Sequence, residues 1–440
     1  MLTRRTRRRR VLVAAAALAV VGGGLASGGP AVAGASPDTA ARACPVLADS
    51  EGWYDDNRAR LQQLIDRYGR CGGEQDGPRD RTAGAPVAVF DWDNTVIKND
   101  VGDATFFWLL RHDKVRQPAG KDWRTTSRYL TRPAADALSA ACGAATPAGR
   151  PLPTSTPAGT RCADELGSVY GEGETTGGEA AFAGFDHRRM EPQYAWLAQL
   201  MNGWTPGQVR EFAAAARSEN LKAPVGALQQ VGSSRVTGWI RYYDQQRDLI
   251  RTLQRSGFDV WITSASPEPV VDVWARGAGV DPSHAIGIRS VVERGRITAH
   301  LQGCGTAEDG DDSVITYIDG KRCWINKVVH GVEGAAAEQP LPVARRQVFA
   351  AGDSDTDVTF LRDATGLRLV LNRNKNEVMC QAYDNADGRW LINPMFIEPK
   401  QRKADPYPCA TTGYVNEDGT SGPVRRDDAS VVPDQQDTVY

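Results

Sequence analysis

The sequence predicts an α/β protein built on a Rossmann-like parallel sheet, and two patterns support this fold class. Three apolar runs without helical spacing indicate buried strands, at residues 87–90, 259–263 and 347–351, and a fourth follows at 367–371. Helical patterns at 239–253 and 325–332 separate the later runs. Strands that alternate with helices form parallel sheets with right-handed crossovers, so these runs belong to one sheet.

The remaining elements are predicted from spacing and capping residues. Leu61, Leu64, Ile65 and Tyr68 recur at helical intervals, which predicts an amphipathic helix over 53–70. Between the first two strands, residues 98–238 contain several helical patterns and no comparable strand, so we expect a large, mainly helical insertion. Within it, Thr205 followed by Pro206 is typical of a helix N-terminus.

The first 33 residues have the features of an export signal. Six arginines precede an apolar run at 11–21, and small residues ending in Ala31-Val32-Ala33 resemble a cleavage site. The apolar run is too short to span a bilayer and no later apolar run is long enough, so we expect a secreted protein without a membrane anchor. The arginines fit either the twin-arginine route or an ordinary export signal.

The charge and length of the chain limit its possible functions and its domain organisation. Removing six arginines from 52 basic residues leaves 46 against 54 acidic ones, a net charge near −8 that does not favour nucleic acid. The roughly 400 remaining residues are too many for one hydrophobic core, so we expect two domains or a core with a large insertion. We predict an N-terminal helix and first strand at 34–97, the insertion at 98–238, the rest of the core at 239–409 and a disordered polar tail at 410–440.

An even number of cysteines in an exported chain indicates disulfides. Neighbouring cysteines would close short loops, which suggests four local pairs: Cys44 with Cys71, Cys142 with Cys162, Cys304 with Cys323, and Cys380 with Cys409. Zinc is the alternative, but the chain has no CxxC motif and its five histidines are scattered.

The first strand ends in a pair of acids that are candidates for catalysis. Asp91 and Asp93 are two residues apart and would leave an extended chain on the same face. The carboxyl ends of strands are where α/β sheets bind ligands. Because two close carboxylates repel, the pair requires a divalent cation, a shared proton or both. The alternative is a strand that runs into an Asp-rich and Asn-rich turn.

Further polar groups follow the other strands. Ser264 follows the second strand, Lys327 opens the next helix, and Asp353 and Asp357 follow the third strand. A nucleophilic carboxylate, a second acid, a hydroxyl, an ammonium and metal-binding acids are the groups that phosphoryl transfer needs. We therefore expect all of them to meet at one edge of the sheet.

These motifs resemble those of the haloacid dehalogenase-like phosphohydrolases. The resemblance rests on Asp91-Trp92-Asp93-Asn94-Thr95, Ser264, Lys327 and the segment from Gly352 to Asp357. The chain is also similar to secreted phosphorylcholine phosphatases and to phosphoserine-phosphatase-like members over roughly residues 85–400, with the insertion only loosely matched. The fold expected from this resemblance is that family's core with a cap inserted after the first motif.

The resemblance also implies roles for these residues. Asp91 would be the nucleophile that forms a phosphoaspartate, and Asp93 the acid that protonates the leaving oxygen and then deprotonates water. Mg²⁺ would bind Asp91, the backbone carbonyl of Asp93, and Asp353, with Asp357 either near the metal or orienting the lysine. Thr95, Ser264 and Lys327 would hold the phosphate oxygens. Asp93 favours phosphomonoester hydrolysis, because a dehalogenase has no leaving alkoxide to protonate.

Two of these assignments have alternatives. Thr263 is the alternative to Ser264, and Lys321 is the alternative to Lys327; we favour Lys327 because Lys321 follows a predicted Asp319-Gly320 turn beside a cysteine. A calcium loop at 353–364 is excluded, because Val358 stands where the loop needs glycine and Ala364 where it needs glutamate.

The insertion would close over the site and select the leaving group. It is rich in aromatic residues that could form a cage for a quaternary ammonium, although most are expected in its helical core: Phe106, Phe107, Trp108, Trp123, Tyr129, Tyr194, Trp196 and Trp204, with Tyr242 and Tyr243 at its exit. The sequence thus predicts a secreted Mg²⁺-dependent phosphomonoesterase acting on a small molecule such as phosphorylcholine. A broad-specificity exported acid phosphatase and a non-catalytic binding protein on the same fold are the alternatives.

Overall fold

The core of the molecule is a six-stranded parallel sheet with the strand order β12-β11-β10-β1-β6-β7. The computed structural model describes residues 43–48, 51–71, 84–143 and 145–440. The strands of the sheet are β1 (Val87–Phe90), β6 (Asp259–Pro267), β7 (Ala285–Ile288), β10 (Phe349–Gly352), β11 (Leu367–Asn372) and β12 (Trp390–Pro394). This sheet confirms the predicted fold class, with β1 at a central position.

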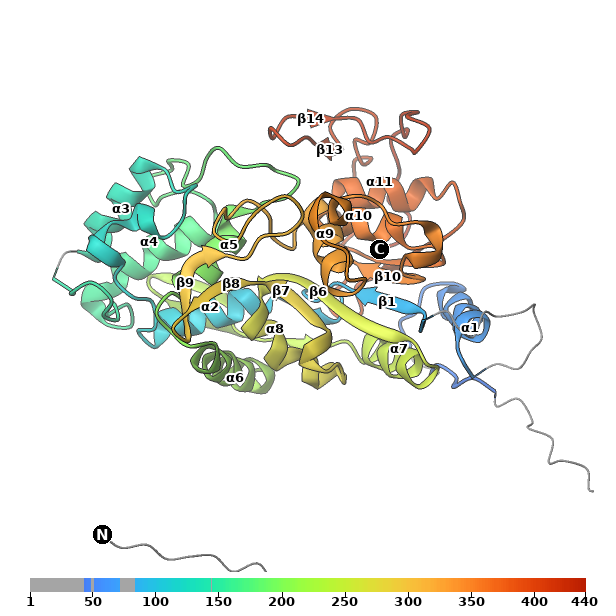
Figure 1. Cartoon of the computed structure of the whole chain (residues 1–440), viewed down its shortest axis with the longest axis horizontal. Helices are drawn as coiled ribbons and strands as arrows, with labels where there is room; N and C mark the ends of the chain where they lie inside the picture. Colours follow the sequence, from blue (N-terminus) through green and yellow to red (C-terminus); the bar gives the residue numbers. More distant parts are fainter. Residues whose placement is uncertain (1–42, 49–50, 72–83, 144) are drawn as a thin grey trace, which may run out of the picture. The chain divides into compact units, whose positions relative to one another are not determined.

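Helices cover both faces of the sheet (Figure 1). The side chains of β1 alternate between these faces: Ala88 and Phe90 belong to one apolar cluster and Val89 to another. The first cluster includes residues of α1 (Asn57–Tyr68), α7 (Asp244–Arg255) and α8 (Glu268–Ala275). The second includes residues of α9 (Asp319–Val328), α10 (Val358–Asp363) and α11 (Asn376–Asp384). Because both faces are buried, these strands are continuously apolar in sequence.

The segment between β1 and β6 is mainly helical. It contains α2 (Val101–Arg111), α3 (Arg132–Cys142), α4 (Thr160–Gly171), α5 (Pro192–Leu200), α6 (Pro206–Lys222) and the hairpin of β3 (Leu228–Val231) and β4 (Ser234–Thr237). Thr205 caps α6 as expected, in a reciprocal capping box with Gln208. The described residues all fall within one compact unit that spans 41–440, so this cap packs against the core.

The two ends of the cap are joined by a short antiparallel pair. Its strands are β2 (Ile97–Lys98) and β5 (Arg241–Tyr242). The prediction of a helix over 239–253 is therefore wrong at its start, because residues 241 and 242 pair with β2 and the helix α7 begins only at Asp244.

A second excursion from the core lies between β7 and α9. It forms the hairpin of β8 (Ser290–Glu293) and β9 (Arg296–Leu301), which was not predicted. The hairpin joins the cap through two backbone hydrogen bonds, from Gly203 N to the Ile297 oxygen and from Ile297 N to the Trp204 oxygen, each 2.8 Å. The cap is thus supported from two separate parts of the chain.

The four predicted disulfides are present: Cys44–Cys71, Cys142–Cys162, Cys304–Cys323 and Cys380–Cys409. All eight cysteines are used. This complete pairing suits an oxidising compartment.

The prediction of a disordered tail at 410–440 is wrong. This part of the chain forms the hairpin of β13 (Tyr414–Val415) and β14 (Ser421–Gly422), and its Val424 and Val432 are fully buried in the cluster that includes α11. Its polar composition suggested disorder, but a few apolar side chains suffice here because the disulfide from Cys409 to Cys380 ties the segment to α11.

The predicted export signal at 1–33 lies outside the described residues. Among the residues that the structure describes, none of the helices has the length and apolar character needed to cross a bilayer.

Candidate active site

Asp91 lies at the tip of the central strand, in a loop that bends immediately after it. The strand ends at Phe90, and the Asp91 amide still donates to the Ala351 oxygen at 2.8 Å. The loop then coils, with Val96 N donating to the Trp92 oxygen at 2.9 Å, and Asn94 adopts a positive φ of 65°. This bend keeps the Asp91 carboxylate at the carboxyl edge of the sheet, where it is 5% exposed.

The ammonium group of Lys321 joins two carboxylates at this edge. Its Nζ lies 2.6 Å from Asp91 Oδ1 and 2.6 Å from Asp357 Oδ1, and the Lys321 side chain is fully buried. Burial alone would lower the pKa of Lys321, but Asp357 and Asp91 raise it above its ordinary value. Lys321 is therefore a fixed positive charge beside the proposed nucleophile.

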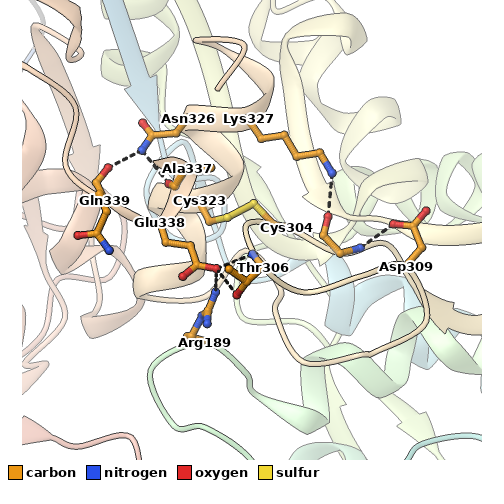
Figure 2. The surroundings of a disulfide bond; sticks show 11 residues. Arg189, Cys304, Thr306, Asp309, Cys323, Asn326, Lys327, Ala337, Glu338 and Gln339 are labelled. Carbon is orange, nitrogen blue, oxygen red and sulfur yellow. Dashed lines mark hydrogen bonds and ion pairs between the residues drawn. A yellow bond between two sulfur atoms is a disulfide. The ribbon is translucent and has the colours of Figure 1, made fainter. Parts of the chain in front are cut away.

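The prediction that Lys327 serves the site is wrong, and the alternative Lys321 takes its place. Lys327 Nζ donates to the Gly303 oxygen at 2.8 Å and lies 4.9 Å from the centre of the Trp324 ring. Figure 2 shows it beside the Cys304–Cys323 disulfide. The physical reason is the start of the helix: α9 begins at Asp319, not near 325, so Lys321 stands in its first turn and Lys327 in its last. Lys327 is six residues further along the helix than Lys321, which places it about 9 Å further along the axis.

The entry to α9 is strained. Ile318 adopts a φ of 42°, a conformation that is costly for a β-branched residue. Its amide donates to the Thr356 oxygen at 3.0 Å, and its carbonyl accepts from Lys321 N at 3.2 Å. The strained turn thus ties the first turn of α9 to the loop that carries Asp357.

That loop follows β10 and brings two further carboxylates to the site. Asp357 Oδ2 accepts from Asp353 N at 2.9 Å and from Ser354 N at 3.1 Å, which leaves its other oxygen for Lys321. Gly352 makes the tight return possible, because a Cβ there would come within 2.6 Å of the Asp357 side chain. Asp357 therefore orients Lys321 and closes the loop.

The carboxylates of this edge fit a divalent cation. One oxygen each of Asp91, Asp353 and Asp357 lie within 4.8 Å of one another, and all three residues are buried. Burial and the charge of Asp357 raise the pKa of Asp91, while Lys321 lowers it. Clustered carboxylate oxygens are the ligands that Mg²⁺ binds, and a cation would offset their repulsion. The Asp93 side chain is not part of this cluster.

The Asp93 side chain points instead toward β6 and the start of the cap. Its Oδ2 accepts from Ser266 at 3.0 Å and from Ser264 at 3.2 Å, and its Oδ1 accepts from Val101 N at 2.7 Å. Burial, followed by the negative charge of Asp100, raises the pKa of Asp93 well above its ordinary value. The raised pKa favours the protonated form of Asp93, which is the form that a general acid needs.

The hydroxyls of Thr95 and Ser264 lie at the site, but each is engaged by an acid. Thr95 Oγ1 lies 3.0 Å from Asp91 Oδ2 and 2.7 Å from Asp353 Oδ1. Ser264 bonds to Asp93, whereas Thr263 Oγ1 has no partner among the described residues. In this structure the Thr95 hydroxyl therefore holds the carboxylates of Asp91 and Asp353, and the Ser264 hydroxyl holds that of Asp93.

A cavity opens above these groups, between the sheet edge and the cap. It is lined from the core by Asp91, Asp93, Ala265, Ser266, Ser354, Thr356 and Arg373, and from the cap by Asp100, Gly102, Tyr170, Tyr194 and Leu197. Asp100 also caps the helix α2, accepting from Asp103 N at 3.0 Å, so the chain that leaves the Asp91 loop enters the cap beside the cavity.

Only one of the aromatic residues suggested for a cage lines this cavity. Tyr194 does so, together with Tyr170, which was not predicted. Phe106, Trp108, Trp123, Tyr129, Trp196 and Tyr243 are instead buried in apolar clusters. Phe107, Trp204 and Tyr242 are partly buried and pack against one of these clusters. Helical spacing identifies such residues as core but does not show which of them faces a cavity.

Ser266 and Arg373 are further site residues that sequence reasoning missed. Arg373 Nη1 donates to Asp353 Oδ2 at 2.6 Å. Ser266 could have been found, because it lies two residues beyond Ser264 and thus on the same face of a longer strand. A single arginine after a strand gives no comparable signal.

Comparison with known proteins shows that part of the chain is similar to a family of hydrolases. Residues 174–362 match the model of the haloacid dehalogenase-like hydrolase family. This span contains Ser264, Lys321, Asp353 and Asp357. Asp91 precedes the span in the sequence, and the fold brings it to Lys321. A search of curated proteins gives no match.

Among solved structures, a conserved protein of unknown function from Anaerococcus prevotii DSM 20548 shares the fold. It is 18% identical, the alignment covers 78% of this chain and 93% of that chain, and the TM-score is 0.57. A protein of unknown function from Bordetella pertussis Tohama I is 16% identical over 70% of this chain and 98% of that one, with a TM-score of 0.40. A phosphoserine phosphohydrolase-like protein from Francisella tularensis is 11% identical over 66% and 89%, with a TM-score of 0.31.

Residues 174–362, less than half of the chain, are similar to the haloacid dehalogenase-like hydrolases, and they include the lysine of α9 and the acids after β10.

Proposed function

We propose that this protein hydrolyses phosphomonoesters through a phosphoaspartate on Asp91. The observation that carries the proposal is the pairing of Asp91 with Lys321 at the tip of β1, with a second carboxyl, Asp93, lining the same cavity. A carboxylate oxygen of Asp91 attacks phosphorus and the bond to the ester oxygen breaks. Asp93 gives its proton to that leaving oxygen. Asp93 then takes a proton from water, which attacks phosphorus, releases phosphate and regenerates Asp91.

The fixed positive charges of the chain assist these steps. Lys321 holds Asp91 in place and offers its charge to the phosphoryl oxygens, while Asp357 fixes Lys321. The proposed Mg²⁺ site comprises Asp91, Asp353 and Asp357, with the backbone carbonyl of Asp93. When bound, Mg²⁺ supplies positive charge that offsets the repulsion between the carboxylate and the phosphate dianion. Thr95 positions Asp91 against Asp353.

The proposed substrate is a small phosphomonoester with a positively charged leaving group, such as phosphorylcholine. The cap side of the cavity offers two phenol rings, Tyr170 and Tyr194, and the carboxyl group of Asp100. Aromatic faces and carboxylates attract a quaternary ammonium. Arg373 also lines the cavity, but its charge is paired with Asp353. A leaving group with its own carboxylate, as in phosphoserine, would be repelled by Asp100.

We also propose that the protein acts outside the cytoplasm after cleavage near residue 33, which the four disulfides support. Phosphate release from phosphorylcholine, phosphoserine and p-nitrophenyl phosphate by the oxidised protein tests the function. A kcat/KM for phosphorylcholine at least tenfold above that for phosphoserine supports the substrate proposal. Equal values would indicate a broad-specificity phosphatase, and no release from any of them would indicate a binding protein.

Removing divalent metal is expected to abolish turnover. Treatment with EDTA followed by desalting should lower phosphate release at least about 100-fold, because the repulsion among Asp91, Asp353 and Asp357 is then no longer offset. Added Mg²⁺ should restore the rate, and the rate restored by zinc or calcium is measured for comparison. Full activity of the EDTA-treated protein, with metal content verified by elemental analysis, would contradict the metal site.

Replacing Asp93 should separate the two halves of the reaction. In Asp93→Asn, turnover of phosphorylcholine is expected to fall about 100-fold or more, because choline is a poor leaving group without a proton donor. The p-nitrophenolate ion leaves without protonation, so rapid mixing with p-nitrophenyl phosphate should show a burst near one equivalent per enzyme. Slow turnover should follow, since Asp93 also activates water. A steady slow rate without a burst would contradict the dual role.

A further inference from the structure

The C-terminal segment, residues 402–439, reaches the edge of the sheet that carries the site. Tyr407 is fully buried, and the disulfide from Cys409 fixes the segment to α11. Near its end, Asp437 is only 1% exposed. The segment is therefore part of the core and contacts strand β11 directly.

The contact is concentrated on Asn372, the last residue of β11. Its Nδ2 donates to Asp437 Oδ1 at 2.9 Å and to the Val439 oxygen at 2.6 Å. Its Oδ1 accepts from Tyr407 Oη at 3.3 Å and from Asn374 N at 2.9 Å. Three of these four hydrogen bonds come from the C-terminal segment. The Asn372 side chain thus has no freedom to rotate without breaking several bonds.

The next residue along the chain is Arg373, which acts on the site. It donates to Oδ2 of Asp353, while Thr95 donates to Oδ1 of the same carboxylate. Asn374 turns the backbone with a φ of 60°, and Tyr407 Oη donates to its side chain at 3.0 Å. The C-terminal segment therefore holds both neighbours of Arg373.

The chemistry of Asp437 argues against simple packing. Besides Asn372, it accepts from Tyr383 Oη at 2.7 Å and from Lys403 N at 2.8 Å. Within the part of the chain that the structure describes, no basic side chain forms an ion pair with it. Burying a carboxylate without a counter-ion is costly, whereas an apolar side chain would stabilise a purely structural contact. What the buried carboxylate supplies, and an apolar side chain would not, is an acceptor aimed at Asn372.

We propose that Asp437 is a positioning residue of the active site, which fixes Asn372 and thereby sets Arg373 on the metal-binding carboxylate of Asp353. The inference rests on the proposed metal site. Groups that orient metal ligands typically contribute 10-fold to 100-fold to metal affinity. Loss of the Asp437 carboxylate therefore lowers the affinity for Mg²⁺, and it does so by more than a loss of fold stability alone explains.

The test is a calorimetric Mg²⁺ titration of the full chain, together with thermal unfolding in the presence and absence of Mg²⁺. The midpoint of the binding isotherm reports metal affinity without substrate, and a rise in Tm with added Mg²⁺ shows that the folded chain binds it. The Tm of the metal-free protein reports the cost to the fold. In Asp437→Leu, which has a similar shape but no acceptor for Asn372, the midpoint should shift to about tenfold higher Mg²⁺. Tyr407→Phe, which removes one hydroxyl from Asn372 and Asn374, should shift it in the same direction by about threefold.

Arg426→Gln is the matched control. Arg426 anchors the same segment to Asp384 of α11, away from Asn372, with Nε 2.8 Å from Asp384 Oδ2. Its metal-free Tm should fall as in the test variants, but its midpoint should stay within twofold of the wild type. In an Arg373→Met background, Asp437→Leu should add less than a twofold shift, because the residue through which Asp437 acts is gone.

Two results would overturn the proposal in different ways. If Mg²⁺ stabilises the wild type and Asp437→Leu has the midpoint of Arg426→Gln, the positioning role is wrong while the metal site stands. If Mg²⁺ does not stabilise the wild type, the metal site itself fails and the proposal fails with it.

Discussion

Replacing Asp91 with asparagine should reduce phosphate release by about 10⁴-fold or more, because an amide cannot form the acyl phosphate. The two side chains have the same shape, so the buried position at the tip of β1 should still be filled. Steady-state turnover on phosphorylcholine and p-nitrophenyl phosphate measures the loss. Mass spectrometry of acid-quenched samples should find a phosphate on the peptide that contains Asp91 in the wild type and none in the variant.

Asp353→Asn distinguishes the nucleophile from a metal ligand. Asp353 lies in the same cluster of carboxylates but makes no bond to phosphorus in the proposed reaction. Its variant should lose about 100-fold at low Mg²⁺ and recover part of that loss at high Mg²⁺, because weaker metal binding is offset by mass action. Asp91→Asn should not recover at any Mg²⁺ concentration. Residual turnover of Asp91→Asn within tenfold of the wild type would disprove the phosphoaspartate.

The sequence predicts the strand-borne part of the site well. Buried parallel strands are continuous apolar runs, and polar residues at their carboxyl ends must meet at one edge, so Asp91, Asp93 and Asp353 could be placed together before any coordinates. Cysteine spacing likewise predicts the four disulfides. In both cases a pattern in the sequence predicts which side chains lie close together in the fold.

The parts that could not be predicted depend on long-range contacts. The lysine was misplaced because Asp319-Gly320 was interpreted as a turn, whereas it opens α9 after the strained Ile318. Lys321 faces Asp91 because α9 begins at Asp319, and the sequence pattern does not reveal this start. The C-terminal segment was expected to be disordered because its stability comes from a disulfide and from buried polar bonds, such as those of Asp437, that composition does not reveal.

Replacing Lys321 with methionine is expected to lower kcat/KM by about 10³-fold, which corresponds to about 4 kcal/mol of transition-state stabilisation. Lys321 is the cation shared by Asp91 and Asp357, both buried. Without it, the two carboxylates face each other unpaired, and the pKa of Asp91 rises further. The nucleophile then loses both its orientation and a neighbour that stabilises the phosphoryl charge. KM should rise and kcat should fall together, because that charge acts on the bound phosphate and on its transition state.

Lys327→Met in the same helix is the control that tests the geometry. Lys327 bonds to the Gly303 oxygen and stacks on Trp324, so its loss should change kcat/KM by less than about twofold. Methionine fills a similar volume at both positions, and Tm measurements on the two variants separate folding defects from catalytic ones. The structure thus predicts a large loss of kcat/KM for Lys321→Met and a small one for Lys327→Met, which is the reverse of what the sequence patterns predict. If Lys321→Met retained activity and Lys327→Met lost it, the assignment of the catalytic lysine and the position of α9 against β1 would both be wrong.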